Sequence, residues 1–119
     1  MAVDAHSQAC MTVFDVYDER CTSRELFKLI TSPWAILIIG ALENGPARFG
    51  ALRRRLQGIS QKVLTDKLRD LEAEGLIDRT VQPRPLAVTY QLTLLGETLI
   101  EPLTALRLWA QDHCNEPRQ

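Results

Sequence analysis

The sequence has little of what enzymes, membrane proteins and secreted proteins usually need. Its two histidines, His6 and His113, lie near opposite ends of the 119 residues, and no Ser/His/Asp, paired-carboxylate or phosphate-loop pattern accompanies them. The longest apolar run, 34–42, is too short to cross a bilayer. Residues 1–8 lack the basic cluster and apolar core of a signal peptide. We therefore expect a cytoplasmic protein that is not an enzyme, needs no cofactor and does not bind a membrane.

Cysteine is also scarce. Cys10, Cys21 and Cys114 are too widely spaced for a zinc site or a disulfide framework, and in the cytoplasm they would normally stay reduced. Cys21 comes just before Ser23, at an expected helix start, where the unpaired backbone donors of the first turn favour a thiolate. Two interpretations stay open. Cys21 is either a reactive thiol, which Cys10 or Cys114 could resolve after oxidation, or a small buried apolar side chain without chemistry.

The net charge of −1 hides an uneven distribution. Between Pro46 and Gln91, nine basic residues outnumber five acidic ones, and the flanking segments are acidic. A basic centre between acidic ends suits a domain that meets a polyanion with one face only. The 45% hydrophobic content is ordinary for a globular protein, and the length fits one domain.

Residues 1–12 are polar and without period, so we expect a flexible tail before one domain over 13–119. Capping residues and apolar periodicity predict five helices in that domain. They run from Ser23 to about Ile30, from Pro33 to the Asn44-Gly45-Pro46 stop, over about Phe49–Leu56, from Ser60 to Gly75 and from Thr93 towards Cys114. Pro102 should kink the last helix, because it removes a backbone donor and its ring clashes one turn back.

After Gly75 the period changes from helical to alternating. Leu76–Val81 and Ala87–Leu92 are rich in good strand formers. Gln82–Pro85, with two prolines, is expected to leave the ladder as an exposed loop. The order of elements predicts a mainly α fold with a small β-hairpin, a winged helix-turn-helix.

The helix from Ser60 to Glu74 has the pattern of a DNA-reading helix. Leu64, Leu68 and Leu71 form one apolar stripe. The opposite side and its edge, near the N-terminus, carry side chains of the kinds that read base edges in a major groove: Gln61, Lys62, Thr65 and Arg69, after Ser60 as the cap. An ordinary solvent-exposed amphipathic helix would show the same pattern, so this helix alone does not distinguish a DNA-binding protein from any other globular protein.

Cations on the neighbouring elements favour DNA. Arg53, Arg54 and Arg55 lie on the preceding helix, which would cross the phosphate backbone. Arg84 lies at the expected tip of the wing, where a cation can enter the adjacent minor groove. Three cationic elements around one motif predict a double-stranded DNA partner.

The same residues carry a resemblance to the HxlR-type regulators, relatives of the MarR type. It covers nearly the whole chain from Cys21 onwards. The segments that carry it are Cys21, Pro33-Trp34, Leu42–Arg53, Gly58–Thr65, Leu68–Ile77 and Tyr90–Gly96. The resemblance implies a homodimer on an inverted-repeat operator, with repression as the family tendency and the terminal helices as the dimer interface. Arg48, Lys62 and Thr65 stand where the family motif has its DNA-facing positions.

The resemblance also suggests a role for Cys21 and a use for the last helix. Cys21 occupies the position of a thiol that senses oxidants or electrophiles in the family, and a bridge to the partner subunit's Cys114 is the sharper hypothesis. The last helix offers more apolar surface than a small core needs, which a second chain could cover: Leu95, Leu99, Ile100, Leu103, Leu106, Leu108 and Trp109.

Two other functions remain open. A winged helix can serve protein–protein contact, with an incidental basic face. The chain could also be a regulator without thiol chemistry that responds to a small molecule in the dimer interface.

Overall fold

A computed structural model describes residues 15–18, 20 and 23–116. The chain divides into two compact units, Met1–Ser32 and Pro33–Gln119, and each is described by itself. The expected tail over 1–12, Cys10 and Cys21 lie outside the described residues. Among the helices that are described, none is both long and apolar enough to span a membrane.

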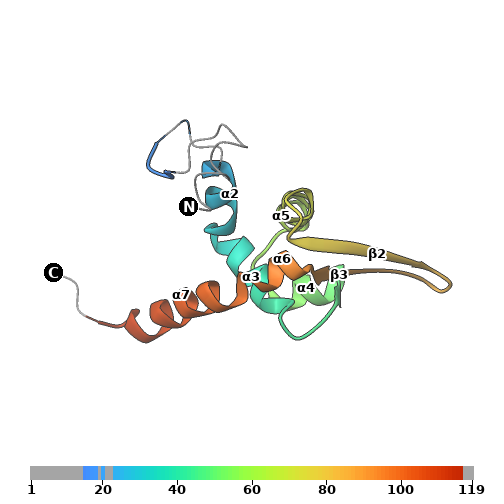
Figure 1. The fold of residues 1–119 in the computed structure, drawn as a ribbon. Helices are drawn as coiled ribbons and strands as arrows, with labels where there is room; N and C mark the ends of the chain where they lie inside the picture. Colours follow the sequence, from blue (N-terminus) through green and yellow to red (C-terminus); the bar gives the residue numbers. More distant parts are fainter. Residues whose placement is uncertain (1–14, 19, 21–22, 117–119) are drawn as a thin grey trace. The chain divides into compact units, whose positions relative to one another are not determined.

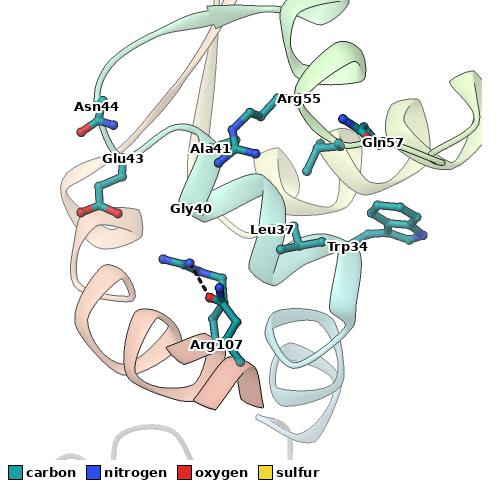
Figure 2. A pocket seen from close by; sticks show the side chains of 11 residues that line it. Trp34, Leu37, Gly40, Ala41, Glu43, Asn44, Arg55, Gln57 and Arg107 are labelled. Carbon is teal, nitrogen blue, oxygen red and sulfur yellow. Dashed lines mark hydrogen bonds between the residues drawn. The ribbon is translucent and has the colours of Figure 1, made fainter. Parts of the chain in front are cut away.

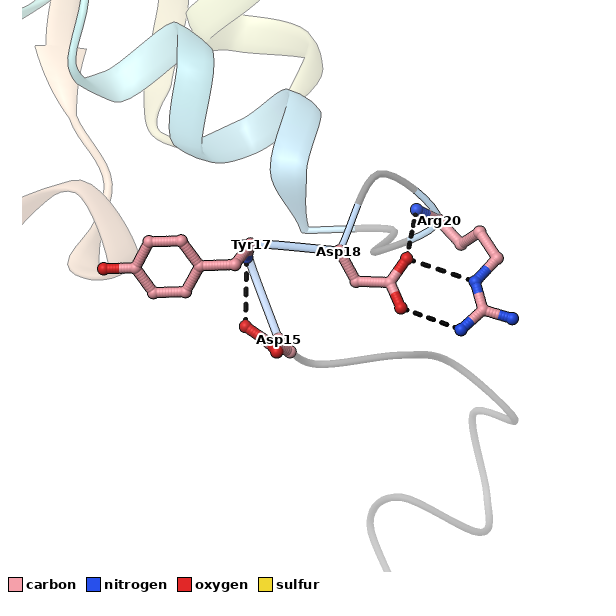
Figure 3. Close-up of polar contacts among 4 residues, drawn as sticks. All are labelled: Asp15, Tyr17, Asp18 and Arg20. Atoms are coloured by element: carbon pink, nitrogen blue, oxygen red, sulfur yellow. Dashed lines mark hydrogen bonds and ion pairs between the residues drawn. The ribbon is translucent and has the colours of Figure 1, made fainter.

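The first unit contains helix α2 (Arg24–Ile30), with Ser23 at the predicted N-cap position. Before it, the Asp18 carboxylate accepts hydrogen bonds from the Arg20 guanidinium at 3.1 and 2.8 Å (Figure 3). These bonds favour the charged carboxylate and lower the pKa of Asp18 below its ordinary value. Thr31 ends the helix, and its hydroxyl donates to the Phe27 carbonyl oxygen at 2.7 Å.

The second unit is a helical cluster with a small antiparallel sheet (Figure 1). Its elements are α3 (Pro33–Ala41), β1 (Ala47–Arg48), α4 (Phe49–Arg55), α5 (Gln61–Ala73), β2 (Ile77–Pro83), β3 (Leu86–Leu92), α6 (Leu94–Glu97) and α7 (Ile100–His113). Helices α3, α4 and α5 and the start of β2 supply most of its buried side chains, which include Ile38, Ile39, Leu52, Leu68 and Ile77. This order confirms the winged helix-turn-helix fold.

Both ends of α5 follow from local sequence. At its start, the Ser60 hydroxyl accepts a hydrogen bond from the Val63 N–H at 3.1 Å, as the capping pattern predicts. At its end, Gly75 has a φ of +76°, and the Leu76 N–H donates to the Leu71 carbonyl oxygen at 3.0 Å. This is the Schellman arrangement that a glycine after a helix favours.

The sheet has the strand order β1-β3-β2. The sequence missed one strand here, and one expectation was wrong. Strand β1 was not predicted, because two residues that pair with Thr89 and Tyr90 leave no periodic signal. The loop over Gln82–Pro85 is shorter than expected, because the ladder continues to the Pro83–Leu86 pair and leaves only Arg84 and Pro85 as the turn. Proline is tolerated there because β2 is an edge strand.

The last predicted helix is two helices. Thr93 caps α6, and its hydroxyl accepts from the Gly96 N–H at 3.0 Å. The chain then turns at Thr98 and Leu99 before α7 begins. Pro102 is the third residue of α7 and therefore needs no helical hydrogen bond for its nitrogen. The predicted disruption is present as a complete break and not as a kink, because the helix is interrupted at Thr98 and Leu99, one turn before Pro102, where the proline ring would clash and its missing N–H would be needed.

A close contact holds α6 against the junction of α5 and β2. The Thr93 N–H donates to the Leu76 carbonyl oxygen at 3.1 Å, and the Thr93 hydroxyl donates to the Gly75 carbonyl oxygen at 2.6 Å. Gly96 is buried there, and a Cβ at this position would collide with the Leu76 carbonyl oxygen. Only glycine therefore fits, and the chain that leads into α7 starts from a fixed place.

Candidate nucleic-acid interface

The exposed face of α5 carries the predicted base-reading side chains. Gln61, Lys62 and Arg69 are exposed and Thr65 is half-buried. On the other side of the helix, Leu64, Leu68 and Leu71 are at most 2% exposed. The core therefore fixes the rotation of α5 and leaves its polar side facing outward.

Lys62 has an acidic neighbour on this face. Its Nζ lies 3.0 Å from a carboxylate oxygen of Asp66, one turn along the helix, and both side chains are at least half exposed. Ion pairs of this kind contribute little to stability, so Lys62 can exchange its partner for a base or a phosphate at low cost. Asp66 shares the reading face, and a carboxylate there can accept from the amino group of a cytosine.

The cations before α5 lie on two elements. Arg48 ends β1 and is the N-cap residue of α4, where it pairs with Thr89 of β3. Arg53, Arg54 and Arg55 form the last turn of α4 and are all exposed. Arg55 additionally lines a cleft between α3 and α7, whereas Arg53 and Arg54 do not.

A hollow of about 400 Å³ lies between α5 and the hairpin. It is lined by Thr65, Leu68, Arg69, Glu72, Arg79 and Tyr90. Arg79 lies opposite Tyr90 in the register of β2 and β3, so two cations from different elements border one groove. Sequence reasoning did not name Arg79 as a site residue. The alternation of strand side chains could have found it, because Arg79 shares a strand face with the buried Ile77.

The hairpin ends on a cation. Arg84 is exposed in the two-residue turn between β2 and β3, as predicted for a wing tip. Figure 1 shows the hairpin extending away from the helices of this unit. The positions of Arg79 and Arg84 place positive charge both at the base and at the tip of the wing.

Helix α7 exposes several large apolar side chains. Leu106, Leu108 and Trp109 are between 46% and 61% exposed. Trp109 stacks on His113, with ring centroids 4.3 Å apart. Cys114 is the exposed C-cap residue, and its thiol donates to the Gln111 carbonyl oxygen at 3.4 Å. Over the described part of the chain, no three His, Cys, Asp or Glu side chains form a metal-binding cluster.

Comparisons with known proteins agree with this geometry. The family model of the HxlR-like helix-turn-helix matches residues 29–118. The uncharacterized HTH-type transcriptional regulator YtfH of Escherichia coli is 42% identical over 98 residues, which are 82% of this chain and 78% of that protein.

Two solved structures show how closely the fold matches. The putative transcriptional regulator YtfH from Salmonella typhimurium has a TM-score of 0.78 at 40% identity, over 84% of this chain and 90% of that one. The redox regulator HypR in its oxidized form has a TM-score of 0.71 at 30% identity, over 83% of this chain and 99% of that one. The chain thus belongs to the HxlR-like helix-turn-helix family of transcriptional regulators.

Proposed function

We propose that the protein binds an inverted-repeat operator as a homodimer and regulates transcription, as a repressor, in the cytoplasm. The observation that carries this proposal is the orientation of α5. A leucine stripe holds one side in the core, and Gln61, Lys62 and Arg69 are exposed on the other. Helices that enter a major groove contact bases with side chains of these kinds in their first turns.

The cations on the neighbouring elements have a different role from the side chains of α5. Arg48, Arg53, Arg54, Arg55 and Arg84 contact phosphates or the minor groove and set the register, while α5 reads the sequence. Arg69 and Arg79 border the groove between α5 and the wing, where a phosphate strand fits between two guanidinium groups. Ser60 acts through its cap, which fixes the backbone at the start of α5.

The salt dependence of binding tests the proposal. Fluorescence anisotropy with labelled duplex from the protein's own promoter region gives the dissociation constant at several salt concentrations. For six to ten phosphate contacts, the affinity should fall about 10³- to 10⁵-fold between ~50 and ~200 mM salt. An affinity that stays flat over this range would assign the basic face to another role, such as contact with a protein.

The homodimer part of the proposal relies on α7. Leu106 and Trp109 lie one turn apart on the helix and are both about half exposed or more. Apolar side chains in this arrangement are typical of a surface that a second chain covers. A dimer built on α7 would carry two copies of α5, as an inverted repeat requires.

We further propose that oxidation switches the protein. Oxidation by diamide would join the Cys21 thiol to the partner subunit's Cys114. The two thiols lose two protons and two electrons to diamide, which becomes its hydrazine. The exposure of Cys114 supports this, and the similar protein HypR is named a redox regulator. Non-reducing gels of Cys21→Ser and Cys114→Ser test it, because a diamide-induced dimer band that persists in both variants would contradict the bridge.

A further inference from the structure

A cleft of about 490 Å³ lies within the second unit, apart from the face of α5. Three helices form its walls: Trp34, Leu37, Gly40 and Ala41 come from α3, Arg55 from the end of α4, and Arg107 and Gln111 from α7. Figure 2 shows the guanidinium groups of Arg55 and Arg107 both turned toward the end of α3. The volume lies within the range of ordinary small-molecule sites.

The charges in the cleft are not matched. Arg107 donates to the side chain of Gln111 at 3.1 Å, which is a neutral acceptor. Over the described residues, no carboxylate lies within ion-pair distance of Arg55 or Arg107. Glu43 is the single acidic residue that lines the cleft, so its lining carries one excess positive charge.

The remaining lining is suited to an organic ligand. Trp34, Leu37 and Leu56 offer apolar surface, and Asn44, Gln57 and Gln111 offer amides that can fix an orientation. Arginine binds carboxylates in a planar, two-point geometry. An organic carboxylate could also contact the apolar wall of the cleft, whereas an inorganic anion would contact the arginines alone. Fully cationic ligands are disfavoured by the two guanidinium groups.

We propose that this cleft binds a small aromatic carboxylate, with its carboxylate between Arg55 and Arg107 and its ring against Trp34 and Leu37. The site would be an effector site within one subunit. It joins α4, which carries phosphate-contacting arginines in the proposed function, to α7, which carries the proposed dimer surface. A bound carboxylate would hold Arg55 in the cleft and away from DNA, and this consequence alone rests on the proposed function.

Titration by NMR tests the binding without DNA. The 119-residue chain has two tryptophans, Trp34 in the cleft and Trp109 on the exposed side of α7. Their indole N–H signals are assigned with Trp109→Phe and followed while benzoate, phenylacetate or indole-3-acetate is added. We expect the Trp34 signal to shift in a saturable way for at least one probe, with a dissociation constant on the order of millimolar, while Trp109 stays unchanged.

Matched variants identify the site. Arg55→Gln and Arg107→Gln should each weaken probe binding by about tenfold or more, because each removes one of the two charges that hold the carboxylate. Arg54→Gln, next to Arg55 but outside the cleft, should leave it unchanged. Benzamide, the neutral analogue of benzoate, should not saturate. No saturation with any of the three carboxylates, equal binding of benzamide, or unchanged binding in both cleft variants would overturn the proposal.

Discussion

Helices α5 and α7 have similar lengths, 13 and 14 residues, but leave opposite kinds of surface exposed. The apolar stripe of α5 is covered within its own unit, and its exposed side is polar, with Lys62 and Arg69 beside Asp66. Helix α7 buries Leu103 and leaves Leu106, Leu108 and Trp109 exposed. The exposed side of α5 therefore suits a hydrophilic partner, which the arginines of α4 and the hairpin would favour as an anion, while the exposed side of α7 suits an apolar partner. The second unit thus has two surfaces that suit binding partners of different polarity.

The largest effect should come from the covered side of α5. Leu64 is completely buried, so Leu64→Ala removes contacts and leaves a cavity. We expect a loss of about 2–5 kcal/mol in the free energy of unfolding, measured by urea denaturation with circular dichroism. A loss well below 1 kcal/mol would mean that the α5 stripe is not a tight core and that the contrast with α7 is weaker than described.

The exposed side of α7 should behave in the opposite way. Trp109→Ala should weaken self-association by about 30-fold or more, since buried tryptophans dominate many interfaces. The change should leave the secondary structure intact, because Trp109 is 61% exposed in the single chain. Sedimentation velocity over a range of concentrations measures this. Gln111→Ala, on the same helix, is the control, and self-association that is equal in both variants would place the dimer interface elsewhere.

The exposed side of α5 should respond in DNA affinity and not in stability. Lys62→Ala and Arg69→Ala are each expected to cost about 1–3 kcal/mol of operator binding, or about 5- to 150-fold. Lys67→Ala is a matched control, because it removes the same charge from another side of the same helix. Fluorescence anisotropy gives the three affinities. Operator binding that is unchanged in both Lys62→Ala and Arg69→Ala would contradict the reading role of α5.

The smallest effect should come from the wing tip. Arg84→Ala should weaken binding almost equally for operator and unrelated DNA, and should lower the slope of log affinity against log salt by about 1. A loss confined to the operator would instead show that Arg84 reads sequence. Anisotropy titrations with both duplexes at three salt concentrations distinguish these outcomes.

Local signals made α5 predictable from sequence. The Ser60 cap, the leucine spacing and the Gly75 stop all act within a few residues, and the structure contains each of them. The features that sequence reasoning missed depend on distant partners. Strand β1 exists because its two residues pair with β3, more than 40 positions further on. The tight fit of Gly96 likewise depends on the backbone at Leu76, which is 20 positions earlier.

In the candidate site too, local sequence predicted some residues, and others depend on contacts between distant elements. The residue types of the reading face could be chosen from helical spacing, because a single stripe determines which side of α5 is free. Arg79 was missed because its proximity to Arg69 requires that the hairpin fold against α5. The cleft between α3, α4 and α7 was not foreseen either, since Arg55 and Arg107 are 52 positions apart and no local pattern links them.

The short turn of the wing has a thermodynamic consequence. Because β2 and β3 stay paired up to Pro83 and Leu86, only two residues at the tip lack a strand partner. A long loop would lose conformational freedom when it settled on DNA, and that loss would subtract from the affinity. Here the paired strands leave only a two-residue turn whose backbone could lose freedom on DNA. The wing is therefore expected to add its contacts with almost no entropic penalty beyond that of its own side chains.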